Sequence, residues 1–241
     1  MIRQTAFGGN KHGFFFCLFL PLSLLFSLLL SGCPRLPEYA LPHINATGGK
    51  SVFSGRGFTY RALTVHDFGA QSPPELSAGQ AKHIFAHSCI RIRLSRKASF
   101  LITHGYNDYF GRSFWAGSVQ SIGFEAVMVP DCSWWNPRVP PEKKGYVLQH
   151  EQIHFALMEI AARRLSRRVG KNLSAFSVID SSRQGVEDQL KEKISTLVQR
   201  ENTKILQTHT SFDEDCSLYF DPEKQQWWFD KVNRELRTWK K

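Results

Sequence analysis

The chain has 241 residues, a formal net charge of +10 and a hydrophobic fraction of 42%, values that fit a folded protein with a sizeable core. Its basic residues are spread along the sequence, apart from one group of four arginines at positions 163–168. No nucleic-acid-binding motif accompanies this charge, so we expect a solvated basic surface and no nucleic-acid partner.

Residues 1–32 have the pattern of a secretion signal. A basic start precedes an apolar run over residues 14–30, and Leu-Ser-Gly-Cys closes the run at Cys33. The segment resembles a bacterial lipoprotein signal, which implies cleavage before Cys33, lipidation of its thiol and attachment to a membrane. The alternative is a simple transmembrane anchor, but the run is at the short limit for spanning a bilayer. We expect a protein of the cell envelope that faces the periplasm.

Cleavage would leave 241 − 32 = 209 residues, which suits one folded domain. Residues 33–56 contain several prolines and glycines and no hydrophobic period, so they are predicted to be a lipidated tether. Residues 57–241 are predicted to form a single domain. Of the cysteines in this part, Cys89, Cys132 and Cys216, two could form a disulfide in an oxidising compartment, and the sequence does not choose the pair.

The first half of this domain predicts a small, mostly antiparallel sheet. Residues 89–94 alternate apolar and basic side chains with period two. Residues 58–65, 99–103 and 124–129 are also typical of strands. Polar residues at 104–109 are expected to form a loop. Further along, the paired tryptophans at positions 134 and 135 either line a cleft or pack under the next helix, and we favour packing.

Residues 145–170 form the strongest helical pattern and contain His150, Glu151 and His154 as an HExxH motif. Positions four apart lie about 40° apart around a helix, so both imidazoles leave one face and can bind one metal ion. Glu151 lies about 100° from His150, beside the position of a metal-bound water. This is the arrangement of a zinc hydrolase in which the glutamate is the general base. An amphipathic helix with two buried histidines is the alternative.

The helical wheel predicts which way the histidines face. Val147, Met158, Ala161 and Leu165 share their side, whereas Glu159 lies on the opposite, polar side. We therefore expect the histidines to face the core, and we expect Glu159 to form a surface ion pair with Arg163, four residues later.

A zinc site of this kind needs a third protein ligand, and a second helix predicted over residues 184–207 can supply it. If the two helices form an antiparallel hairpin closed near residues 169 and 183, residues near 200 lie opposite the histidines. Glu201 lies on the apolar stripe at that level and is one candidate. A shorter last helix is predicted from Gln225 to Leu236.

From Phe58 onward the chain resembles a bacterial family of unknown function whose members are described as predicted zinc-dependent proteases. The resemblance is carried by Leu63-Thr64-Val65-His66-Asp67-Phe68, Pro73-Pro74, Ser133-Trp134, the segment His150 to Phe155 with Glu159 and Ala162-Arg163-Arg164-Leu165, Phe212 to Cys216, and Gln225 to Trp228. It makes Asp213 a second candidate for the third ligand. The family pattern has a histidine where this chain has Leu218. Either His209 or Asp213 replaces it, or this protein differs from the family in activity.

Together these patterns predict an α+β fold, with a small antiparallel sheet beside a helical hairpin that carries HExxH. The predicted function is a lipid-anchored zinc metallopeptidase of the cell envelope. His150 and His154 would bind zinc, Glu151 would be catalytic, and Glu201 or Asp213 would complete the site. The substrate would be a peptide or a cell-wall peptide. The alternative is a non-catalytic lipoprotein that binds a protein or cell-wall partner.

Overall fold

A computed structural model describes residues 57–73, 84–107, 111–216 and 220–239. The predicted signal peptide, the lipidated Cys33 and the tether to residue 56 lie outside the described residues. Within the described ranges, none of the helices combines the length and the hydropathy that crossing a membrane would require.

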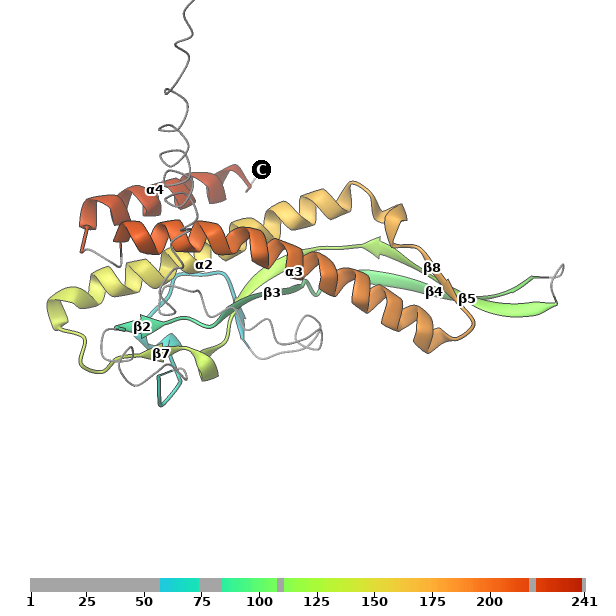
Figure 1. Cartoon of the computed structure of the whole chain (residues 1–241), viewed down its shortest axis with the longest axis horizontal. Helices are drawn as coiled ribbons and strands as arrows, with labels where there is room; N and C mark the ends of the chain where they lie inside the picture. The colour runs from blue at the N-terminus through green and yellow to red at the C-terminus, as the bar shows by residue number, and fades with distance from the viewer. Residues whose placement is uncertain (1–56, 74–83, 108–110, 217–219, 240–241) are drawn as a thin grey trace, which may run out of the picture. The chain divides into compact units, whose positions relative to one another are not determined.

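The described strands form three small antiparallel sheets, so the predicted α+β class with small antiparallel sheets is confirmed (Figure 1). The first has the order β1-β6-β3, and the second pairs β2 with β7. Their bounds are β1 Phe58–Thr59, β2 Ala86–His87, β3 Ile90–Leu94, β6 Phe124–Met128 and β7 Trp134–Trp135. Trp134 is buried, as the packing interpretation predicted.

The third sheet, β4-β5-β8, consists of a long hairpin and one added strand: β4 Ser99–Asn107, β5 Arg112–Ser121 and β8 Val178–Asp180. The loop predicted at residues 104–109 was wrong for its described part, because residues 104–107 continue β4. Residues 108–110 lie outside the described ranges. Pairing with β5 carries β4 beyond the expected residues 99–103, since His104 lies opposite Trp115 and Asn107 lies opposite Arg112.

Helix α2, Lys144–Gly170, carries the HExxH motif and lies at the centre of the described domain. Residues 155–162 are all buried, although only some of them are apolar on the predicted inner face. The reason is that α2 packs on β3 and β6 and also on helices α3, Arg183–Cys216, and α4, Pro222–Thr238. Apolar side chains all around a helix are typical of one that is covered on several sides.

This enclosure corrects the prediction for Glu159. Its ion pair with Arg163 is present, with Nε and Oε1 2.7 Å apart, but the carboxylate is buried and not at the surface. The second carboxylate oxygen accepts a hydrogen bond from the backbone N–H of Ala126 on β6 at 3.1 Å. Glu159 therefore fastens α2 to the sheet, and its burial is compensated by two partners.

The segment between α2 and α3 determines how those helices meet. It contains a 3-10 turn, η7 Leu173–Phe176, followed by β8, which pairs with β5. The start of α3 consequently lies over the β4-β5-β8 sheet (Figure 1). A Cβ atom at Gly117 of β5 would come within 2.3 Å of the side chain of Val186 on α3. The described residues also include the 3-10 turns η3 Val65–Asp67, η5 Pro130–Cys132 and η6 Pro141–Lys143.

The grouped arginines at the end of α2 have defined roles in packing. Arg164 pairs with Glu235 of α4 at 2.6 Å, and Arg168 pairs with Glu201 of α3 at 2.6 Å. The guanidinium of Arg167 lies 4.0 Å from the ring centroid of Trp239. These contacts join α2 to both neighbouring helices.

Cys89 and Cys132 form a disulfide that joins the start of β3 to η5. Cys216, the remaining cysteine in the described part of the chain, is a buried free thiol. Burial raises the pKa of the Cys216 thiol to about 12, and the nearby charge of Asp215 adds to the shift.

Candidate metal centre

Two turns of neighbouring helices bring three metal-binding side chains together. His150 and His154 leave α2 one turn apart, as the HExxH spacing predicts, and Asp213 faces them from α3. Asp213 Oδ1 lies 3.1 Å from His150 Nε2 and 3.0 Å from His154 Nε2, and the two Nε2 atoms are 3.1 Å apart. The three donor atoms form a nearly equilateral triangle.

The spacing of this triangle fits a metal ion. Zinc is held about 2.0–2.1 Å from each ligand, so two donors of a tetrahedral site lie roughly 3.3 Å apart. Two imidazoles and one carboxylate are also a known donor set for catalytic zinc, with one coordination position left for water. The histidine and aspartate side chains keep 13–14% of their surface exposed, so this group is reachable from solvent. These residues can therefore hold a metal ion.

Aromatic packing fixes the ring of His150. Phe212, the residue before Asp213, is fully buried and lies nearly parallel to this imidazole, with ring centroids 4.4 Å apart and an interplanar angle of 26°. The same phenyl ring meets His154 edge-on at 4.9 Å and Trp228 of α4 at 5.6 Å. Phe212 thus joins the three helices directly beneath the site.

The other side of His154 faces a further histidine, His209, one turn before Asp213 on α3. The Nδ1 atoms of these two residues are 2.7 Å apart, and their rings are almost parallel at 3°. His209 is buried, and its Nε2 atom has no hydrogen-bond partner among the described residues. His154 therefore uses one ring nitrogen toward the triangle and the other toward His209.

The charges of the group are strongly coupled. Burial alone would raise the pKa of Asp213, but the charge of His154 and the hydrogen bonds of both site histidines hold it well below its usual range. Burial lowers the pKa of His154, yet the charge of Asp213, a hydrogen bond to it and the charge of Glu151 raise it above the ordinary value. Burial, together with the charge of His154, lowers the pKa of His209 to about 3. Without a metal, the interaction of Asp213 with His154 therefore favours the carboxylate form of Asp213 and the protonated form of His154.

Glu151 is buried on the helix face next to the histidines. Its charge is close enough to contribute to the raised pKa of His154. This places a carboxylate beside the triangle but outside it, as the HExxH spacing predicts for a proton acceptor. Its surroundings are dry, which strengthens its interaction with a nearby positive charge.

Of the two candidates for the third ligand, the structure brings Asp213 to the histidines and places Glu201 elsewhere. Glu201 accepts a hydrogen bond from Arg168 Nη2 at 2.6 Å, near the other end of α2. The expected hairpin register was therefore wrong, since residues 209–213 and not residues near 200 lie opposite His150 and His154. The error arises because η7 and β8 separate the helices, so that α3 first crosses the β4-β5-β8 sheet.

Helix α4 holds the beginning of α2 in place near this group. The fully buried amide of Gln225 donates to the backbone carbonyl of Tyr146 at 2.9 Å and to Gln149 Oε1 at 2.8 Å. Tyr146 in turn donates its hydroxyl hydrogen to the carbonyl of Cys216 at 2.8 Å. These bonds tie the turn before His150 to the turn after Asp213. In the sequence, Gln225 to Trp228 carried part of the family resemblance, but this packing role was not predicted.

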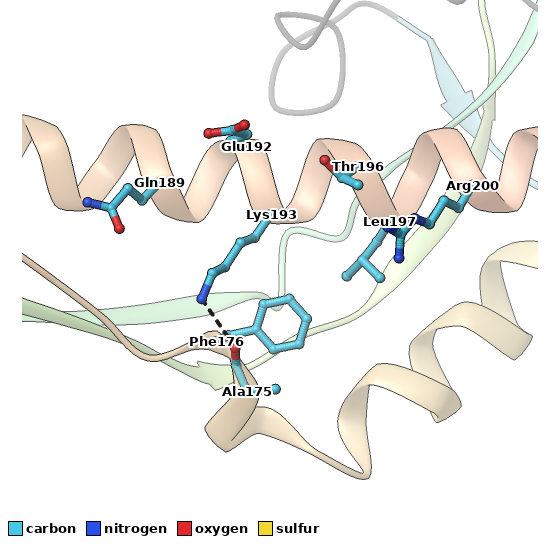
Figure 2. A pocket seen from close by; sticks show the side chains of 8 residues that line it. All are labelled: Ala175, Phe176, Gln189, Glu192, Lys193, Thr196, Leu197 and Arg200. Carbon is cyan, nitrogen blue, oxygen red and sulfur yellow. Dashed lines mark hydrogen bonds between the residues drawn. The ribbon is translucent and has the colours of Figure 1, made fainter.

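A separate hollow of about 500 Å³ lies between η7 and the first half of α3 (Figure 2). The residues that line it include apolar Phe176 and Leu197 and charged Glu192, Lys193 and Arg200. Lys193 Nζ donates a hydrogen bond to the carbonyl of Ala175 at 3.4 Å, so this ammonium group already has a partner within the protein (Figure 2). The eight residues that line the hollow include no histidine or cysteine, so the chemistry of the described residues points to the group on α2 and α3.

His209 and Phe212 belong to this group, yet sequence reasoning gave His209 only as a possible replacement for a family histidine and gave Phe212 no role. The spacing of His209 to Asp213 on one helix, at i − 4, was the available signal. Comparison of the chain with protein-family models, with curated proteins and with solved structures finds no match. The resemblance to a family of predicted zinc proteases therefore stays a prediction.

Proposed function

We propose that this protein is a zinc-dependent hydrolase with a zincin-like site, and that it cleaves peptide bonds at the surface of the cell envelope. The observation that carries the proposal is the triangle of His150 Nε2, His154 Nε2 and Asp213 Oδ1, with sides of 3.0–3.1 Å. Glu151 next to this triangle supplies the fourth functional group of the HExxH arrangement.

Each side chain then has one task. His150, His154 and Asp213 hold the ion, while Phe212 keeps the ring of His150 in place. A bound zinc ion lowers the pKa of a water molecule to about 7 and polarises a carbonyl group. Glu151 accepts the proton of the attacking water and later delivers it to the leaving amine, which is the general acid–base part of peptide hydrolysis.

Two observations favour a catalytic over a structural zinc site. Structural sites are closed by four protein ligands, whereas the described residues offer a group of three with part of its surface exposed. A structural site also has no use for a carboxylate between its histidines, yet Glu151 is buried there without belonging to the triangle. Both features favour an ion that keeps one position for water.

The proposed location is the periplasmic side of a bacterial membrane, with lipidated Cys33 as the anchor. The disulfide between Cys89 and Cys132 supports this location, because such bonds persist in oxidising compartments and are rare in the cytosol. The proposed substrates, accordingly, are proteins or cell-wall peptides within reach of the membrane surface.

The decisive test compares Glu151→Gln and His150→Ala with the parent, each as the full-length chain in detergent. Zinc content is measured together with hydrolysis of a mixed fluorogenic peptide library and of cell-wall peptides. We expect one zinc per chain and turnover in the parent. Glu151→Gln should keep the zinc and lose about 10²–10⁴-fold in rate, because the general base is gone. His150→Ala should lose both properties.

Two outcomes would contradict the proposal. Equal turnover of Glu151→Gln and the parent would remove Glu151 from the chemistry. A parent chain that takes up no zinc, and whose fold is unaffected by chelator, would favour the alternative of a lipoprotein that binds an envelope partner without catalysis.

A further inference from the structure

His209 has a burial and a position that the proposed ligand set leaves unexplained. Only 3% of its surface is exposed, and it lies one turn from Asp213 on the same helix. Its ring does not belong to the triangle of metal-binding atoms. A buried imidazole beside another histidine is costly unless hydrogen bonding or function compensates for it.

The geometry determines how the proton is shared. Two ring nitrogens at 2.7 Å must form a hydrogen bond, so one of the two Nδ1 atoms donates and the other accepts. When His154 binds a metal through Nε2, its remaining proton is on Nδ1, and His154 is the donor. His209 then accepts through a bare Nδ1 and carries its own hydrogen on Nε2.

We propose that His209 is a positioning residue which accepts the Nδ1–H of His154 and so holds that imidazole in the tautomer and orientation that present Nε2 to the metal. This inference rests on the proposed metal site. Metal-bound histidines usually donate this hydrogen bond to a carboxylate, a backbone carbonyl or water. Here a neutral histidine takes that place, so the ligand is oriented without adding a second negative charge next to Asp213.

The near-parallel rings add to this role. With an angle of 3° between them, the ring of His209 restricts rotation of the His154 ring about its χ2 bond, because rotation would break the hydrogen bond and the ring contact together. The cost is a buried Nε2 without a partner among the described residues. We infer that fixing the ring of His154 outweighs the cost of leaving Nε2 of His209 without a partner.

The test measures zinc affinity of the full-length chain by competition with a chelating indicator dye, using three variants. His209→Leu keeps most of the volume and removes the acceptor. His209→Asn places an amide oxygen near the position of Nδ1 and restores an acceptor. Ile205→Ala, one turn earlier on α3, is buried but has no polar role, so it controls for general loss of packing.

We expect His209→Leu to bind zinc about 10–100-fold more weakly than the parent, the size typical of lost hydrogen bonds to a metal ligand. His209→Asn should recover most of that loss, and Ile205→Ala should bind zinc like the parent. Parent-like affinity of His209→Leu, or an Asn variant as weak as the Leu variant, would overturn the proposed role. A parent that does not bind zinc would instead contradict the proposed function, so the two failures are distinguishable.

Discussion

Two contacts between helices α2 and α3 are made by a carboxylate that is largely shielded from water, and the two contacts differ in chemistry. At one end, Glu201 of α3 is paired with Arg168 of α2 at 2.6 Å. At the other end, Asp213 of α3 is paired with His150 and His154 of α2 at 3.1 and 3.0 Å. Both carboxylates stabilise the same helix pair, and both are largely shielded from water.

The difference is whether the partner can give up its positive charge. The guanidinium of Arg168 keeps its proton at any ordinary pH, so Glu201 is permanently satisfied and offers nothing to a metal. The imidazoles can each lose a proton and then present a lone pair together with Asp213. A metal competes with protons for these imidazoles, so zinc binding should weaken as the pH falls. The comparison shows that the partner, more than the carboxylate, separates an ion pair from a ligand set.

The largest expected effect is on zinc affinity, when Asp213 is replaced by its neutral amide. The same exchange at Glu201 is the control. Asp213→Asn should weaken zinc binding by about 100-fold or more, because a charged ligand is lost from a set of three. Glu201→Gln should bind zinc like the parent, since its carboxylate contacts Arg168 at the other end of the helices. Equilibrium dialysis with zinc measures both. A loss of affinity in Glu201→Gln would show that the two contacts are not independent.

Removal of the metal should have an intermediate effect, a lower thermal stability, and this effect should depend on Asp213 but not on Glu201. At a free zinc concentration about 100 times the Kd, binding adds roughly 2.7 kcal/mol to the free energy of unfolding. For a domain of this size, that corresponds to a fall in Tm of about 5–10 °C when a chelator is added. Glu201→Gln should show the same fall. Asp213→Asn, for which this zinc concentration is at or below the Kd, should show a fall of at most about 1–2 °C. Thermal unfolding with and without chelator measures these changes in Tm. An equal response of the parent and both variants would contradict the expectation.

The smallest effects concern the stability of the ion pair itself. Arg168 keeps 48% of its side-chain surface exposed, whereas Glu201 keeps 8%. Glu201→Gln leaves a guanidinium that water can solvate and should lower the free energy of unfolding by less than about 1 kcal/mol. Arg168→Gln leaves a buried carboxylate without its charged partner and should lower it by about 1–2 kcal/mol. Urea unfolding of the metal-free variants measures the order. The reverse order would show that Glu201 is better solvated than its burial indicates.

Much of the fold followed from local pattern. The described helices begin close to where they were predicted, and so do several of the strands, because hydrophobic periodicity and turn residues act over short distances. Helix α3 was predicted to end at Gln207, however, and it continues to Cys216. Strand β5 and the continuation of β4 to Asn107 were missed, since they depend on pairing with each other over a long hairpin. The burial of Glu159 was also missed, because a wheel shows one helix and not the sheet and two helices that enclose it.

The candidate site was predictable to the extent that one helix determines it. His150, Glu151 and His154 are placed by helical spacing alone, and the structure presents the two histidines as that spacing requires. Which carboxylate lies opposite the histidines depends on the register between α2 and α3. That register is decided by β8, a strand of three residues that few local signals could identify. The family resemblance pointed to Asp213, whereas the hairpin argument pointed to Glu201.

The enclosure of α2 has a consequence for the motions of the site. Its central residues 155–162 are buried on every side, and Glu159, Gln152 and Gln149 bond to separate neighbouring segments. The backbone amides of this stretch should exchange with solvent deuterium only when the whole domain unfolds. Helix α2 is then the rigid part of the candidate site, and any adjustment to the proposed peptide substrate must come from the surrounding strands and loops.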